Sequence, residues 1–416
     1  MFSFLKRNPR YFRYWIATWF SEFGDWARNM TLMFMVLELS NHSPVAVSLN
    51  MFFEFAPIFI FGSIVGVFAD RWNRKMTMIF ANIFRVSMIP IFMLALLFES
   101  LTLIYLGAFM CAIGTLFYRA PGPAFIMQFV AEEDRKTAAS LRQLTVSIMM
   151  LVGAGIGTTL YVWLGAIWSL GLNMFVFLIS VLLILSIKVS EQNEVKSNQK
   201  NLGSIWLEMR EGFQYSWSHP IVRPILFTNV FVGFGSGLIN VSSVFILTEF
   251  LGLSEKMFGL FVSLQGGGML LSVYLVSKIK LSMNRMVSYG MIIVGVGLIG
   301  LVIYPSLYIT SIFLLLFCFG QVALNIGLGT LMQTKVDYQY QGRAGMTINT
   351  VSMGFMVIAM LFTGWLHELF TIQPLIMLGG ILIVCGGVLC FILFLRVINS
   401  KDEVLVTNAV SKLTSV

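Results

Sequence analysis

Charged residues are scarce in this sequence. Asp, Glu, Lys and Arg make up 11% of its 416 residues, whereas hydrophobic residues make up 58%. A soluble globular domain is about 25% charged and about 45–50% apolar. With a mean hydropathy of +0.86, the chain has too few charges to cover a water-exposed surface. This excludes a soluble enzyme, a nucleic-acid-binding domain and an intrinsically disordered chain.

Histidine and cysteine are also rare. The three histidines, His42, His219 and His367, fall in expected loops and predict no clustered metal site. The four cysteines lie inside apolar runs without a Cys-x-x-Cys pair, which is typical of small buried hydrophobic residues. No Walker A motif is present, so we expect neither ATP hydrolysis by that route nor a bound cofactor.

Long hydrophobic runs dominate what is present. A membrane-spanning helix needs about 20 mostly apolar residues. Twelve runs meet this length, at approximately 13–38, 45–69, 75–98, 101–123, 139–163, 167–188, 222–248, 257–277, 286–304, 308–332, 345–367 and 374–397. We therefore predict an all-α polytopic membrane protein with twelve transmembrane helices.

The longest polar stretch divides these runs into six and six. We predict an N-terminal six-helix bundle at 1–188, a cytoplasmic linker at 189–220, a C-terminal six-helix bundle at 221–398 and a cytoplasmic tail at 399–416. Within the linker, the pattern at 203–217 is amphipathic and predicts an interfacial helix.

Lysine and arginine set the expected orientation. They alternate between loops, and both termini and the linker fall on the basic side, which the positive-inside rule places in the cytoplasm. The net charge of +8 is explained in the same way. The first apolar run is too long for a signal peptide, so we expect it to be retained as a span in the cell membrane.

A charged motif follows the second run. Its fixed positions, in the pattern G-x-x-x-D-R-x-x-R-[RK], are Gly66, Asp70, Arg71, Arg74 and Lys75. The motif resembles the signature loop of the major facilitator superfamily, and it lies where that family has it, between spans two and three. The resemblance implies two six-helix bundles that work by alternating access, with this motif acting as a cytoplasmic gate.

Shorter stretches resemble one branch of that superfamily. The segments 22–26, 62–75 and 341–343 are similar to drug and siderophore exporters, including macrolide efflux proteins and the enterobactin exporter. Span five departs from the exporter pattern, because the glycines of 153–159 lack the expected proline. This departure leaves open a uniporter or importer of a small organic or lipid-like solute.

Three charged side chains lie inside the first span, namely Glu22, Asp25 and Arg28. A charge at the bilayer centre costs roughly 2.5–3.5 kcal/mol, so each is a functional candidate. Glu22, Asp25 and Asn29 are spaced i, i+3 and i+7, which places them on one helical face beside Trp26. We expect this face to line a cavity and Asp25 to couple transport to protons.

Other intramembrane charges extend this set. Arg28 of span one and Glu54 of span two fall at similar depth, which predicts an ion pair, and Arg85 falls at the level of Asp25. Secondary candidates lie nearer the cytoplasmic ends of their spans: Arg119, Arg142, Gln143 and Arg343. The alternative interpretation is a static network that neutralises itself and fixes helix packing.

Taken together, these patterns predict a secondary active exporter of a drug, macrolide or siderophore-like molecule, driven by proton antiport. Its expected partners are the small-molecule substrate, protons and the bilayer, without nucleic acid, and we expect a monomer. The arginines favour an anionic substrate and the carboxylates a cationic one, so its charge stays open. A polytopic membrane enzyme is the remote alternative, since it would need a nucleophile–base pair or metal ligands at the membrane face.

Overall fold

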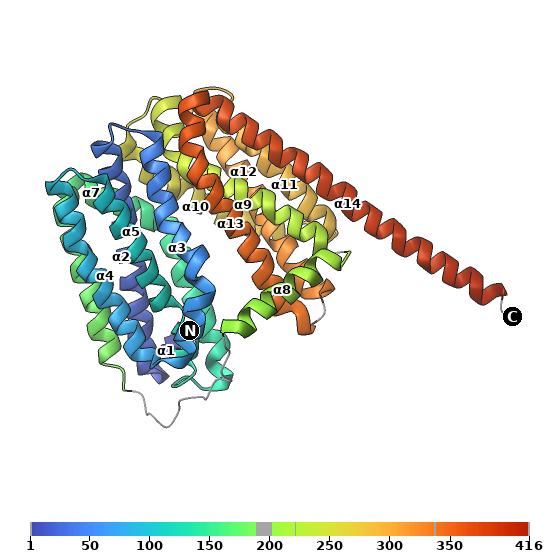
Figure 1. The fold of residues 1–416 in the computed structure, drawn as a ribbon, viewed down its shortest axis with the longest axis horizontal. Helices are drawn as coiled ribbons and strands as arrows, with labels where there is room; N and C mark the ends of the chain where they lie inside the picture. The colour runs from blue at the N-terminus through green and yellow to red at the C-terminus, as the bar shows by residue number, and fades with distance from the viewer. Residues whose placement is uncertain (1, 189–201, 221, 337, 415–416) are drawn as a thin grey trace. The chain divides into compact units, whose positions relative to one another are not determined.

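The computed structural model describes residues 2–188, 202–220, 222–336 and 338–414, and those residues form helices and turns without a β-strand (Figure 1). The first half contains α1 (Phe2–Arg7), α2 (Pro9–Leu39), α3 (Pro44–Arg71), α4 (Arg74–Leu97), α5 (Leu101–Arg119), α6 (Gly122–Ile126), η1 (Glu132–Asp134) and α7 (Arg135–Leu185). The second half contains α8 (Leu202–Ser218), α9 (Val222–Phe245), η3 (Ile246–Phe250), η4 (Glu255–Met257), α10 (Phe258–Ser277), α11 (Met283–Leu301), α12 (Leu307–Lys335), α13 (Tyr338–Phe370) and α14 (Ile372–Thr414).

The helices reproduce the predicted spans. Within the described residues, ten helices are long and apolar enough to cross a membrane. The 31-residue α2 is not among these ten, although its length is sufficient, because Glu22, Asp25 and Arg28 interrupt its apolar sequence. The all-α polytopic fold is therefore confirmed.

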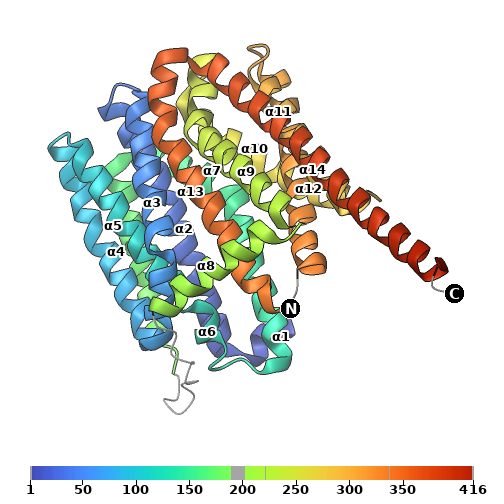
Figure 2. The ribbon, with the colours of Figure 1, turned by 45° about the vertical axis from the view of Figure 1, so that its right-hand side comes forward.

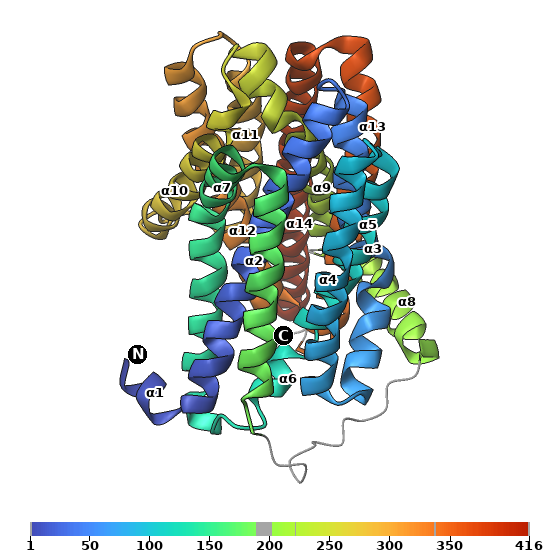
Figure 3. The ribbon, with the colours of Figure 1, turned by 90° about the vertical axis from the view of Figure 1, so that its left-hand side faces the viewer.

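Helix α7 accounts for two of the predicted spans. Gly165 has a φ of +73°, in the left-handed region, and breaks the 51-residue helix. The chain then runs back, so that Ala138 and Ile184 meet in one apolar cluster (Figure 3). The resulting hairpin corresponds to the runs at 139–163 and 167–188.

Short polar caps define where the helices begin. Ser43 accepts a hydrogen bond from the Ala46 backbone and precedes Pro44, while Asn73 accepts one from the Met76 backbone at 3.0 Å. These two turns mark opposite ends of the helices of the first half. We name them the Ser43 end and the Asn73 end.

The chain forms two compact units. Unit 1 contains Met1–Ile205, Leu247–Gly266 and Met360–Leu369, and unit 2 contains Trp206–Ile246, Gly267–Ala359 and Phe370–Val416. In unit 1, α2 packs along α7, and α4 packs between α5 and α7. In unit 2, α11 packs against α12 and α14, and α14 also contacts α9 (Figure 2). The linker expected at 189–220 falls partly on 189–201, which lie outside the described residues, and α8 forms at the amphipathic pattern.

Two segments from the second half close the Ser43 end of unit 1. Ser48 donates a hydrogen bond to the Leu361 carbonyl at 3.1 Å, and His42 Nε2 lies 2.8 Å from Glu255 Oε2. A Cβ at Gly259 would lie 2.9 Å from the Ala154 carbonyl oxygen, which shows how closely the backbones approach. The contact is therefore both polar and tightly packed.

Candidate functional site

Helix α2 is the central element of the site. One side packs on α7, where a Cβ at Gly24 would lie 2.8 Å from the Phe177 ring and one at Gly153 would lie 2.5 Å from the Trp26 ring. The Asn173 side-chain amide donates to the Gly24 carbonyl at 2.5 Å. These contacts hold α2 at one rotation about its axis. They also turn Trp26 toward α7 at Gly153.

Asp25 lies among three guanidinium groups. Arg85 Nη1 donates to its two carboxylate oxygens at 2.9 and 3.1 Å, and Arg28 Nη1 lies 3.0 Å from Oδ1. Arg119 Nη2 lies 3.5 Å from Oδ2. Asp25 is only 5% exposed, so these cations replace the solvation that burial removes. The geometry favours a carboxylate that stays ionised.

Arg85, on α4, is held through both terminal nitrogens of its guanidinium. It is fully buried, and its Nη2 donates to Ser21 Oγ at 2.8 Å and to Asn82 Oδ1. Its guanidinium carbon lies 4.2 Å from the centre of the Phe177 ring and 4.8 Å from that of Tyr118, at cation–π distance. The Asp25–Arg85 pair is therefore a rigid anchor between α2 and α4.

Glu22 forms the second ion pair of the cluster. Arg119 Nη2, at the end of α5, lies 2.8 Å from Glu22 Oε2. The Glu22 side chain is 10% exposed and that of Arg119 is 52% exposed, so this pair reaches from the interior toward the Asn73 end. Arg119 contacts both Glu22 and Asp25, which agrees with the helical spacing that places these two acids on one face of the first span.

The ion pair expected between Arg28 and Glu54 is not formed. Asn29 lies between them, because Arg28 Nη2 and Nε donate to Asn29 Oδ1 at 2.9 and 3.2 Å while Asn29 Nδ2 donates to Glu54 Oε1. Depth along the bilayer placed the two charges at one level but did not give their direction around each helix. Glu54 makes no ion pair with a residue that the structure describes.

The structure thus brings together seven of the predicted residues: Glu22, Asp25, Arg28, Asn29, Glu54, Arg85 and Arg119. Three carboxylates face three guanidiniums, so the cluster sums to zero charge when every group is ionised (3 − 3 = 0). A neutral sum is what allows this many charges at membrane depth.

Other candidates lie elsewhere. Arg142 Nη1 is near Gly122 and Tyr14 toward the Asn73 end, and Gln143 is exposed on α7. Arg343, in unit 2, pairs instead with Glu211 of α8 at 2.7 Å. None of these three side chains joins the described contacts of Asp25.

Sequence reasoning missed the uncharged partners of the cluster. Ser21 and Asn82 bind the Arg85 guanidinium, and Thr115 Oγ1 lies 3.5 Å from Arg85 Nη1. The available signal was their helical spacing, since Ser21 precedes Asp25 by four residues and Asn82 precedes Arg85 by three. Inserting an uncharged polar side chain into the membrane costs less free energy than inserting a charged one, so a search for intramembrane charges does not find these residues.

The gate motif is only partly described. The side chains of Gly66 and Asp70 lie outside the described residues, whereas Arg71 is exposed and Arg74 is buried at the start of α4. Lys75 Nζ donates to the carbonyls of Leu185 and Ile187 at 2.9 and 2.8 Å. Lys75 therefore caps the end of α7, where carbonyl groups lack helical partners.

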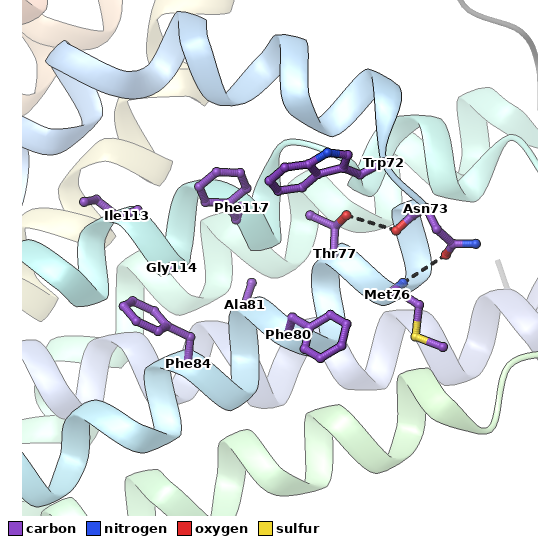
Figure 4. A pocket seen from close by; sticks show the side chains of 10 residues that line it. All are labelled: Trp72, Asn73, Met76, Thr77, Phe80, Ala81, Phe84, Ile113, Gly114 and Phe117. Carbon is purple, nitrogen blue, oxygen red and sulfur yellow. Dashed lines mark hydrogen bonds between the residues drawn. The ribbon is translucent and has the colours of Figure 1, made fainter.

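A separate cavity of about 470 Å³ lies between α4 and α5 at the Asn73 end (Figure 4). Its walls are apolar rings and small side chains, namely Trp72, Met76, Phe80, Ala81, Phe84, Ile113, Gly114 and Phe117, together with Asn73 and Thr77. Because this lining has no ionisable side chain, the cavity is distinct from the charge cluster. Within the described residues, no group of three or more His, Cys, Asp or Glu is placed to hold a metal ion.

Comparisons with known proteins cover nearly the whole chain. A family model described as "Transmembrane secretion effector" matches residues 5–413. The chain is 26% identical to the MFS-type transporter YkuC of Bacillus subtilis over 357 residues, covering 81% of this chain and 80% of YkuC. It is 22% identical to macrolide efflux protein A of Streptococcus pyogenes over 370 residues, covering 87% and 90%.

Solved structures share the fold at low sequence identity. The nucleoside transporter NupG superimposes with a TM-score of 0.74 at 12% identity, covering 92% of this chain and all of NupG. A bacterial homologue of the iron transporter ferroportin in an inward-facing state gives 0.72 at 16% identity, covering 93% and 98%. At these identities the similarity shows the fold alone.

Proposed function

The chain belongs to the transmembrane secretion effector family of major facilitator transporters, and from this premise we propose that it exports a small organic molecule by proton antiport. It is a multi-pass membrane protein of a transporter family. Substrate, direction and driving ion are the proposed parts. The candidate substrates are drugs, macrolides and siderophore-like molecules.

The buried charge cluster carries the proposal. Three carboxylates and three arginines at membrane depth are costly to insert and serve ion or substrate pathways far more often than packing alone. Carboxylates are also the side chains that exchange protons in many membrane pumps and transporters. The distant similarity to a macrolide efflux protein supports export and a drug-like substrate.

The contacts at the Ser43 end support alternating access. We propose that this end faces the outside and that the termini are cytoplasmic, because the basic loops lie at the other end. The segments Leu247–Gly266 and Met360–Leu369 then form a closed outer gate within unit 1. Release of substrate to the outside requires these contacts to separate.

The membrane potential supplies sufficient energy. One charge moving through 100 mV yields about 2.3 kcal/mol. At 1.36 kcal/mol per tenfold change, this supports roughly a 50-fold substrate gradient for each net charge moved. No nucleotide is required.

The first test measures accumulation of erythromycin and ethidium in cells that express the wild type or Asp25→Asn, with and without a protonophore. We expect at least a fivefold lower accumulation with the wild type, abolished by the protonophore and absent in the variant. The physical reason is that Asp25 organises three cations, which the amide cannot neutralise. Membrane insertion is checked by the yield of monodisperse purified protein.

Two results would overturn the proposal. Uphill export by Asp25→Asn at the wild-type level would remove the cluster from the coupling path. Exchange of either probe without any proton movement in vesicles would favour a uniporter or importer instead.

A further inference from the structure

The three acids of the cluster differ in their partners. Asp25 and Glu22 each lie within 3.0 Å of at least one guanidinium nitrogen. Glu54 has only the Asn29 amide as its described hydrogen-bond partner. An amide donates to a carboxylate or to the carbonyl oxygen of a carboxylic acid, so this partner fits both protonation states. A guanidinium carries a positive charge and therefore favours the ionised state.

Glu54 is nonetheless connected to the ion pairs. The Arg28 guanidinium is shared, with Nη1 at 3.0 Å from Asp25 and Nη2 donating to Asn29 Oδ1 at 2.9 Å. The Asn29 amide then donates to Glu54. Arg28 thus contacts Asp25 directly and is linked to Glu54 through the Asn29 side chain.

The backbone of α3 is locally weakened next to Glu54. Pro57 lies inside the helix and has no N–H, so the Phe53 carbonyl lacks its usual donor. Helices bend most readily at such positions. Glu54 is also partly exposed, whereas Asp25 is buried. The Glu54 side chain is therefore partly accessible and lies on the part of α3 that bends most readily.

We propose that Glu54 is the carboxyl group that takes up and releases the transported proton, while Asp25 stays ionised as the anchor of Arg85. In the step, a proton from a hydronium ion adds to one Glu54 carboxylate oxygen, the O–H bond of that ion breaks to leave water, and release reverses both changes. When Glu54 is ionised, its negative charge attracts Arg28 toward α3. When it is protonated, Arg28 remains with Asp25.

The net charge of the cluster then indicates which class of substrate it binds. With Glu54 ionised the cluster sums to zero, and with Glu54 protonated it sums to +1. A proton and a cationic substrate therefore exclude each other, as antiport requires, whereas an anionic substrate would bind better together with the proton. This inference rests on the proposed function and selects lipophilic organic cations over anions.

Infrared difference spectra of the purified full-length protein between acidic and alkaline buffer test the proton carrier directly. We expect a carbonyl band of a protonated carboxylic acid in the wild type, its loss in Glu54→Gln and its retention in Asp25→Asn. Glu38→Gln, which alters an exposed acid near the end of α2, is the matched control and should leave the band unchanged. A band lost in Asp25→Asn and kept in Glu54→Gln would overturn the assignment.

Transport separates this inference from the proposed function. In everted vesicles we expect Glu54→Gln to lose proton-driven ethidium uptake by at least tenfold while ethidium exchange across the membrane continues. Full proton-driven uptake by this variant would contradict the inference alone. Absence of proton-driven uptake of either probe by the wild type would contradict the proposed function, whatever the infrared band shows.

Discussion

Helix α2 in unit 1 and helix α11 in unit 2 are held in place by different forces. α11 packs by close backbone approach, since a Cβ at Gly295 would lie 2.6 Å from the Gly380 carbonyl oxygen and one at Gly297 would lie 2.8 Å from Phe317 Cα. α2 packs on α7 through glycine as well, but its other side presents Asp25 to α4 and Glu22 to α5. Steric packing has one optimum, whereas a charge network changes its optimum when a proton is added.

The difference predicts that the two helices respond differently to pH. A helix held by glycines is insensitive to pH and potential, so α11 suits a fixed frame. A helix held by ion pairs is sensitive to both. Substitutions that exchange or remove these two kinds of contact test the assignment.

The largest effect is expected from Arg85→Met. Removing one partner of a buried ion pair leaves the other charge without compensation and costs about 3–5 kcal/mol. Thermal unfolding in detergent should show this loss, and the double variant Arg85→Met with Asp25→Leu should recover much of it. A double variant no more stable than the single variant would show that the pair is not the source of the loss.

A smaller loss is expected from Gly295→Val in unit 2. The new side chain meets backbone atoms of α14, which cannot give way as a flexible side chain does, so overpacking should cost about 1–3 kcal/mol. Gly329→Ala is the matched control, because nothing lies within 4 Å of its added Cβ. If both variants unfold at the wild-type temperature, α11 is not held by close packing. Neither variant should change the pH dependence of transport.

The smallest effect is expected from Lys75→Met at the Asn73 end. The variant removes two hydrogen bonds to the terminal carbonyls of α7 and should cost about 1 kcal/mol. The expected readout is a small fall in unfolding temperature that high salt reproduces in the wild type. A fall as large as that of Arg85→Met would mean that this end of α7 contributes more than its cap.

The sequence predicts where the helices begin and end better than it predicts which side of each helix faces its neighbours. Apolar length alone gives the boundaries of α3 and α4 to within two residues of the expected spans at 45–69 and 75–98, and the structure adds the caps at Ser43 and Asn73. Depth likewise places Arg85 opposite Asp25, and their contact confirms it. Length and depth are properties of one helix at a time.

Features that depend on how helices turn toward one another were not predictable in this way. Trp26 turns toward Gly153, and Asn29 separates Arg28 from Glu54. The insertion of Leu247–Gly266 and Met360–Leu369 into unit 1 also depends on tertiary contacts of Ser48 and Ala154 that no local pattern encodes. The proton-coupling role that the sequence predicts for Asp25 stays a prediction, and the proposal above moves the transported proton to Glu54 and keeps Asp25 as the anchor of Arg85.

The direct junction at Gly165 lets α7 link two distant contacts of unit 1. Two long helices are joined at this residue without a loop, and the bend between them lies at the Ser43 end. One arm presents Ala154 to Gly259 of the closing segment, and the other holds the backbone of α2 through Asn173 and Ser180. We therefore expect a displacement of Leu247–Gly266 to reach the helix that bears Asp25 through α7 and its bend at Gly165.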